Sequence, residues 1–342
     1  MDKNRPPVYY SEYLQLDKIL NAQEMESAKE GIRADDEMLF IVIHQVYELW
    51  FKLVLHEVNI VREIFKKDII LDSSPDLYNT VYRLNRVREI LKVLVGQITV
   101  IETMAPLDFL DFRDLLRPAS GFQSIQFKIL EASLGLSFDD RYGKQYYLSQ
   151  ITQSDIDRVK AAESQVPLIQ LVNDWLERMP YADNAKYWDN AEGFWEHYRS
   201  TYQASLSENE MDNLTAFDKL FINAAAYDAE RKFTQKASKN ALFIMLYRDY
   251  PMLHLPYQVL TALLDIDDLM SDWRHRHIQM VQKTIGNRAG TGGSTGAQYL
   301  KAARDSHHIY KELADLTSFL LPRADLPKLP EVLVKKLCNI TE

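Results

Sequence analysis

The sequence predicts an all-α protein built as a multi-helix bundle. Apolar residues recur at three- and four-residue spacing over long stretches, which is typical of helices with one buried face. Few runs alternate with period two, and the sequence contains no Asn-Gly hairpin turn. Eleven glycines and twelve prolines are spread over 342 residues with no Pro- or Ser-rich linker. We therefore expect one domain over residues 1–342, with no internal repeat.

The first strong helix is expected over residues 35–67. Three acidic residues open it and two lysines close it, as the helix dipole favours. Its second face is also apolar, so we expect the helix to lie in the middle of the bundle, where the polar His44 needs a partner. The apolar residues are Leu39, Val42, Val46, Leu49, Leu53, Ile60 and Ile64 on one face, and Phe40, Ile43, Tyr47 and Phe51 on the other.

Further helices follow in order along the chain, and proline and glycine mark most of their ends. The pattern predicts helices over residues 75–102, over 107–115 after Pro106, and over 122–134 after a turn at Pro118 and Gly121. Residues 135–154 are less regular. Later helices are expected over 156–178 with a break at Pro167, over 208–250 up to Pro251, over 256–285 up to Gly286, and over 295–320. Residues 184–205 are aromatic and polar.

Charge and cysteine content exclude several function classes. The net charge is −9, with acidic residues spread along the chain, so nucleic-acid binding is disfavoured. Cys338 is the single cysteine, which precludes a disulfide within the chain and fits a reducing compartment. The N-terminus has no apolar core of signal-peptide type, and no uninterrupted apolar run approaches about 18 residues. We expect a cytoplasmic protein without a membrane or nucleic-acid partner.

The eight histidines do not form a zinc motif. No HExxH sequence occurs, and His275 and His277 are two apart, so on one helix they point in different directions. His307 and His308 are adjacent and have the same difficulty. A single axial ligand to haem remains possible, because haem needs one protein ligand and an apolar slot.

Three pairs at i,i+4 spacing place an aromatic ring and a polar group on one helix face. Each pair could bind or polarise a ligand, but ordinary core packing explains the spacing equally well and is the commoner case. The pairs are Phe40 and His44, Phe109 and Arg113, and Trp273 and His277.

Longer blocks of sequence are more specific than these pairs. The chain resembles the tryptophan 2,3-dioxygenase family from about residue 9 to residue 326, loosely over 135–235. The blocks stand in the family's order and approximate spacing. They are YSEYLQLDKIL (10–20), DEMLFIVIHQVYELWFK (36–52), ETMAPLDFLDFRDLLRPASGFQSIQF (102–127), LLDIDDLMSDWRHRHIQMVQ (263–282) and GTGGSTGAQYL (290–300).

The resemblance implies a haem pocket with one haem b per subunit. His277 corresponds to the axial ligand of the haem iron, with Trp273 beside it, and Ser120 and Gly121 correspond to a turn at the haem edge. The spacing analysis alone left His277 as one candidate among eight histidines.

The resemblance also implies the substrate side of the pocket. Phe40, His44 and Phe109 match residues around the indole, with His44 taking the hydrogen bond of the indole N–H. Arg113 matches the group that holds the substrate carboxylate, which suits the planar fork of arginine. The alternative for Arg113 is a salt bridge with Asp111 or Asp114.

Two further segments are implicated by the resemblance. Thr291 opens a TGGS loop that contacts the amino-acid head of the substrate in the family; a plain flexible connection is the alternative. Tyr10 and Tyr13 match tyrosines of an N-terminal arm, residues 1–20, that reaches the active site of a neighbouring subunit, which implies a homotetramer. The chain departs from the family at Ala297, where many relatives have Tyr, and at Thr295, which replaces a Ser; this puts substrate affinity in doubt more than the reaction.

The activity implied is cleavage of the indole C2–C3 bond of L-tryptophan with O2, giving N-formyl-L-kynurenine in the first step of the kynurenine pathway. Three alternatives stay open from the sequence. They are a haem monooxygenase acting on another indole, a haem-binding sensor without catalysis, and a helical scaffold without cofactor.

Overall fold

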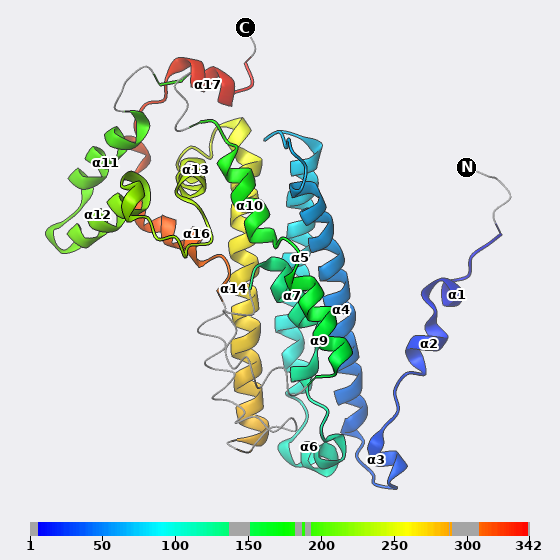
Figure 1. The fold of residues 1–342 in the computed structure, drawn as a ribbon. Helices are drawn as coiled ribbons and strands as arrows, with labels where there is room; N and C mark the ends of the chain where they lie inside the picture. Colours follow the sequence, from blue (N-terminus) through cyan, green and yellow to red (C-terminus); the bar gives the residue numbers. More distant parts are fainter. Residues whose placement is uncertain are drawn as a thin grey trace.

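The computed structural model describes residues 6–136, 151–181, 187–188, 193–286, 288 and 308–340. Throughout these residues the regular structure is helical, which confirms the predicted all-α class. Three long helices, α4 (Asp36–Phe65), α5 (Pro75–Ile101) and α14 (Pro251–Ile285), run the length of the body (Figure 1). α5 packs against both α4 and α14, so it forms the centre of this group.

The helix α4 confirms the first predicted element, but the expectation that it lies in the middle of the bundle was wrong: α5 is the central helix, and one apolar face of α4 is exposed. Asp36 and Glu37 stand in its first turn, where the helix dipole favours negative charge. Val54, Val58 and Val61 are fully buried on the side that faces the bundle. Each buried side chain of this size contributes roughly 1.5–3 kcal/mol of transfer free energy, so this stripe fixes which face of α4 turns inward.

Capping residues and prolines determine where the middle helices begin. α5 starts at Pro75 behind Ser74, whose side chain accepts the N–H of Leu77. α6 (Pro106–Arg113) also has proline in its first turn, and α7 (Ile125–Leu134) is capped by Ser124. α9 (Gln153–Glu163) and α10 (Leu168–Glu177) are separated by the predicted break at Pro167.

The C-terminal part forms an aromatic-rich unit at one end of the long helices (Figure 1). Its elements in chain order are α11 (Gly193–Ser205), η3 (Glu208–Glu210), α12 (Met211–Phe217), η4 (Asp218–Ile222), η5 (Ala224–Ala226), α13 (Gln235–Leu246), α16 (Lys311–Asp315), η6 (Leu316–Phe319), η7 (Arg323–Asp325) and α17 (Glu331–Leu337).

The expectation of one long helix over 208–250 was wrong. The segment divides into α12, the π-helical turn η4, the short η5 and α13. Between η5 and α13 the backbone N–H groups of Lys232 and Phe233 bond to the carboxylate of Glu312, at 2.7 and 3.2 Å. A distant side chain therefore takes the place of helical partners, which a local pattern does not reveal.

The boundary near residue 251 was also misplaced. Pro251 does not end a helix but opens α14, where a first-turn proline lacks only an N–H that would have no helical partner. Pro256, the expected start, lies inside the helix. Of the helix expected over 295–320, residues 295–307 lie outside the described part. The remainder forms α16 and η6, short helices instead of one long one.

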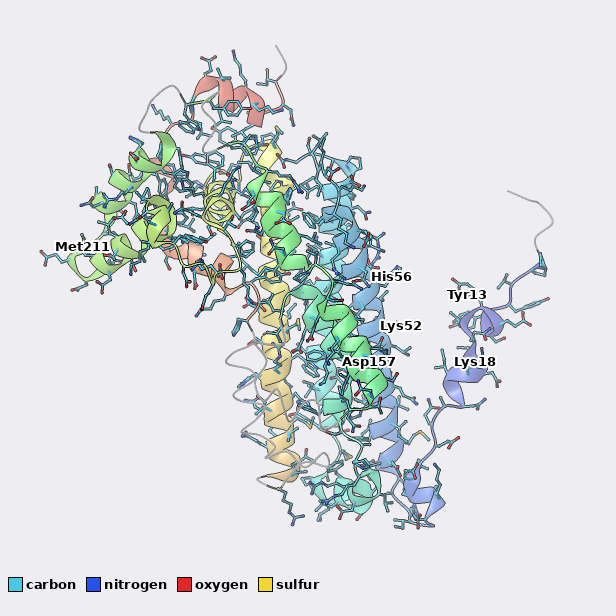
Figure 2. All side chains as sticks on the ribbon, viewed as in Figure 1. Tyr13, Lys18, Lys52, His56, Asp157 and Met211 are labelled. Carbon is cyan, nitrogen blue, oxygen red and sulfur yellow. The ribbon has the colours of Figure 1, made fainter. Side chains whose placement is uncertain are left out.

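The N-terminal arm stands away from the body (Figure 1). It contains α1 (Tyr10–Leu14) and α2 (Leu16–Leu20), and α3 (Glu26–Lys29), which follows it, lies beside the start of α4. The arm is attached near its end, where the buried carboxylate of Glu37 accepts the N–H groups of Glu26 and Ser27 at 2.8 and 2.9 Å. Figure 2 shows Tyr13 and Lys18 on the part that extends away from α4.

By length and composition alone, α4 could cross a membrane, with a mean hydropathy of 1.6. The pair of α5 and the segment 106–116, bent by 90°, would pass the same test as one broken span. The sequence predicted no such helix, because no uninterrupted apolar run approaches about 18 residues. α4 packs against α5, α7 and α10, as a core helix does. However, only 17% of its most apolar 18-residue stretch is buried, so the described part of the chain leaves much of the apolar surface of α4 exposed.

A buried ion-pair group joins α4 to α5. Both carboxylate oxygens of Glu57 accept a hydrogen bond at 2.8 Å, from Arg83 and Arg86. Burial alone would raise the pKa of Glu57, but the hydrogen bonds from Arg86 and Arg83 outweigh it and hold this pKa below its usual value. A depressed pKa of this kind stabilises the fold above the unfolded pKa, and that stabilisation is lost as the pH falls through the folded pKa.

We therefore predict that Glu57→Gln lowers the free energy of unfolding by about 1–2 kcal/mol at pH 7, because the neutral amide pairs more weakly with two partly exposed arginines. The difference should shrink as the pH falls below the usual range of a carboxyl. Urea denaturation at pH 7 and at lower pH checks both points. Glu63→Gln, which removes an exposed partner of Lys66 on the same helix, is the control and should change little. A constant difference at all pH values would contradict the prediction.

Candidate functional site

The candidate site lies where α4, α6 and α14 meet. α6 contacts both of the longer helices at one end of the body (Figure 1). Each of the three helices bears one of the aromatic–polar pairs that the spacing analysis singled out. The fold therefore brings together pairs that are up to about 230 residues apart in the sequence.

An aromatic wall forms between α4 and α6. The ring centroid of Phe40 lies 4.1 Å from that of His44, 5.7 Å from that of Phe109 and 5.7 Å from that of Phe112. Phe109 and Phe112 meet edge to face at 5.4 Å. Such contacts hold rings in fixed relative orientations, so the wall presents a defined apolar surface.

A hydrogen bond within α4 determines the tautomer of His44. Its Nδ1 lies 2.7 Å from the carbonyl oxygen of Phe40, which can only accept, so Nδ1 bears the proton. Nε2 is left with a lone pair to accept a hydrogen bond. Burial lowers the pKa of His44, although the bond to Phe40 and the charge of Glu48 oppose the shift. The imidazole is therefore held neutral.

Arg113 ends α6 as a buried residue, one residue beyond the fully buried Phe112. The alternative pairing proposed from the sequence, with Asp111 or Asp114, does not occur among the salt bridges of the described residues; Asp114 pairs with Arg117 at 3.2 Å. A buried guanidinium beside an aromatic surface is suited to binding a carboxylate through two parallel hydrogen bonds.

His277 on α14 is stacked against its own helix neighbour. The rings of Trp273 and His277 are nearly parallel, with centroids 5.3 Å apart and an interplanar angle of 5°. His277 keeps some accessible surface, but protein atoms surround it closely enough that burial lowers the pKa of its imidazole to about 4. A positive charge on His44 would disfavour one on His277, so the two imidazoles lie near enough to interact.

The turn at Ser120 and Gly121 is held by local hydrogen bonds. Ser120 caps η2 (Gly121–Gln123), accepting the N–H of Phe122, and the side chain of Gln123 accepts the N–H of Ser120, both at 3.3 Å. The buried Lys128 of α7 donates to the carbonyl oxygen of Phe122 at 2.5 Å. The turn is thus fastened to α7, beside the rings that surround Trp273.

Two predicted site residues lie apart from the others, and a third lies outside the described residues. Tyr10 and Tyr13 lie on the arm, and each is 75% exposed. Thr291 lies outside the described residues, as do Thr295 and Ala297. The described part of the chain resumes at His308. There the buried carboxylate of Asp267 on α14 accepts the N–H groups of Ile309 and Tyr310 at 3.0 and 2.9 Å.

Sequence reasoning missed the residues that support the site. Phe112 completes the aromatic wall, and Tyr47, Phe51 and Phe127 pack around Trp273. The available signal was position: Tyr47 lies three residues after His44, on an adjacent part of the same helix face. Within the described residues, no group of three or more His, Cys, Asp or Glu side chains could hold a metal ion.

The arrangement offers three chemical functions. The aromatic wall can take a flat apolar ring, with the lone pair of His44 available to an N–H group. Arg113 can bind a carboxylate. His277, a neutral imidazole held by stacking, can ligate a metal centre that accepts one protein ligand.

The chain is similar to known proteins over nearly its whole length. The family model described as tryptophan 2,3-dioxygenase matches residues 2–320. A tryptophan 2,3-dioxygenase of Alteromonas mediterranea is 42% identical, covering 98% of this chain and 99% of the relative. Those of Dictyostelium discoideum and Xenopus tropicalis are 39% and 40% identical, covering 96% and 94% of this chain and 88% and 84% of the relatives.

Proposed function

The chain belongs to the tryptophan 2,3-dioxygenase family and is an oxidoreductase of tryptophan catabolism; we propose that it binds one haem b per subunit between α14 and α4. The family uses haem. The reaction proposed is cleavage of the indole C2–C3 bond of L-tryptophan by O2, with N-formyl-L-kynurenine as product and the first step of the kynurenine pathway as its role. The whole chain acts as one dioxygenase domain in the cytoplasm.

The observation that supports this proposal best is the pair of neutral imidazoles on facing helices. His277 has the lone pair that an axial ligand needs, because its pKa of about 4 keeps it unprotonated at neutral pH. Its neighbour Trp273 has a buried indole N–H without a hydrogen-bond partner among the described residues. A free donor of this kind suits a cofactor with acidic side groups. The residues present therefore fit haem.

When bound, haem supplies the oxygen chemistry that amino-acid side chains lack. His277 on α14 would hold the iron. Phe40 and Phe109 pack against the indole, and the lone pair on Nε2 of His44 accepts the indole N–H. Arg113 holds the carboxylate, together with Thr291 at the amino-acid head, while Ser120 and Gly121 border the cofactor. Holding the reacting bond in one orientation lowers the entropic part of the barrier.

His44 orients the substrate in this mechanism and is not an indispensable base. An indole N–H is a very weak acid, so proton abstraction by a neutral imidazole of lowered pKa is unfavourable. The bond that fixes Nδ1–H on the Phe40 carbonyl keeps the lone pair of Nε2 directed away from its own backbone.

The exposed arm and the outer face of α4 support self-association as a homotetramer. Val8, Tyr9, Tyr10, Tyr13 and Leu20 are exposed on the arm, and Met38, Val42 and Leu49 on α4. Solvent-exposed apolar surface on this scale favours an interface with a second copy. Tyr10 and Tyr13 would then reach the site of the neighbouring subunit.

The test of the function is an optical experiment on haem-reconstituted protein. The sample is reduced anaerobically with dithionite, and O2 and L-tryptophan are then added while the N-formylkynurenine absorbance is followed. A five-coordinate ferrous haem spectrum and a growing product band are expected. Haem without product, or a product that contains one added oxygen atom, would favour a sensor or a monooxygenase. Failure to bind haem would overturn the proposal.

Arg113→Ala is predicted to raise KM for L-tryptophan by about 10²-fold, because the substrate carboxylate loses its buried partner. Steady-state kinetics measures the change, and the haem spectrum confirms an intact cofactor site. Arg117→Ala is the matched control, since Arg117 is a nearby but exposed arginine; it should leave KM unchanged. An unaltered KM in Arg113→Ala would refute the assigned role.

His44→Ala is predicted to reduce kcat/KM by about 3–10-fold, the effect of losing one orienting hydrogen bond. Activity should persist, because no step depends on proton removal by this residue. The measurement is turnover at saturating O2 with the haem content held equal. Complete loss of activity in a folded, haem-loaded variant would show that His44 is an obligatory base.

A further inference from the structure

Trp273, the neighbour of His277, is enclosed by rings from two other helices. The centroid of its ring lies 6.0 Å from that of Tyr47 and 6.3 Å from that of Phe51, both on α4 and both edge to face. Phe127 of α7 lies 5.0 Å away. Rings packed on three sides leave Trp273 little rotational freedom, so the plane of His277 stacked on it is constrained as well.

The hydroxyl of Tyr47 is anchored on α5, and its ring packs edge to face against Trp273. Tyr47 is buried and donates its O–H to the carbonyl oxygen of Leu94 on α5 at 3.0 Å, which leaves the lone pairs of its oxygen available. Burial raises the pKa of Tyr47 to about 12, so the phenol stays protonated and keeps its bond to Leu94. The indole N–H of Trp273 makes no hydrogen bond within the described residues, so the link between Tyr47 and Trp273 is the edge-to-face packing of their rings.

We propose that Tyr47 is a positioning residue for the haem ligand: its ring, anchored to the carbonyl of Leu94 through the hydroxyl, orients Trp273, and Trp273 orients the imidazole plane of His277. This inference rests on the proposed role of His277 as the axial ligand. Tyr47 touches neither substrate nor iron in this scheme, and it acts through Trp273. Groups behind a metal ligand commonly fix its orientation in this way.

The position of Tyr47 gives the arrangement a further property. Tyr47 lies three residues from His44 on α4, so one helix bears the substrate-side imidazole and the group that orients the iron-side imidazole. α5 holds the hydroxyl from behind through Leu94. A displacement of α4 would therefore alter both sides of the cofactor together.

The test is Tyr47→Phe in the haem-loaded enzyme. The substitution keeps the ring that packs on Trp273 and removes the oxygen. The readout is electron paramagnetic resonance of the ferric cyanide adduct, whose g values depend on the orientation of the axial imidazole plane. We expect one narrow species in the natural protein, and a broadened or split signal in Tyr47→Phe because the imidazole adopts more than one orientation.

Tyr198→Phe is the matched control. It also removes a buried tyrosine hydroxyl that donates to a backbone carbonyl, that of Phe319 at 2.7 Å, but it lies in the C-terminal unit away from Trp273. If the loss of a buried hydroxyl hydrogen bond were enough to broaden the signal, Tyr198→Phe would show the same change as Tyr47→Phe. We expect the signal of Tyr198→Phe to match that of the natural protein. A signal in Tyr47→Phe identical to that of the natural protein would overturn the proposal.

A second variant, which leaves Tyr47 in place, tests the same link from the side of Trp273. Trp273→Phe retains a smaller ring against His277 and reduces the contact with Tyr47, so it should broaden the signal to a similar extent. The double variant should add nothing further, since both changes break one link. Additive effects would mean that Tyr47 acts by another route. A natural protein that binds no haem would instead refute the role of His277 itself, which separates the two failures.

Discussion

The contact between α14 and α4, made through aromatic rings, is the constraint on which the site depends. Trp273 of α14 is enclosed by Tyr47 and Phe51 of α4 and by Phe127 of α7. Rings that meet edge to face tolerate little sliding, so they set the register of α14 against α4. The buried ion pair of Arg274 with Glu131, at 2.7 Å, ties the next residue of α14 to α7. Because His277 is one turn further along α14, its position follows from these contacts.

The parts of the fold that depend on local pattern could be predicted from the sequence. α4 was predictable because its apolar spacing continues for some thirty residues, and α5, α6 and α10 because proline or a capping serine marks each start. The segment 208–250 was not predictable, since Glu312, some 80 residues later, takes the N–H groups of Lys232 and Phe233. Pro251 was misjudged because proline both ends and begins helices, and the choice depends on packing beyond it.

The candidate site shows the same division. Helical spacing put Phe40 with His44, Phe109 with Arg113 and Trp273 with His277, and the fold brings these pairs to one end of the body. Spacing could not distinguish a site from ordinary packing, and it is the family resemblance that favours a site. Neither argument identified Tyr47, because the positioning role that we propose for it depends on the carbonyl of Leu94 on α5 and on the ring of Trp273 on α14.

The two sides of α4 have different roles, which explains why the helix is apolar on both. The inner side holds Phe40, His44 and Tyr47 and must pack tightly against α6 and α14. The outer side bears Met38, Val42 and Leu49, whose exposure costs free energy in an isolated chain. Burying that side against a second copy would stiffen the helix that positions His44 and Tyr47. Self-association and precision at the site would then depend on the same helix, so a weakened interface would loosen the geometry of the candidate site before it unfolds the chain.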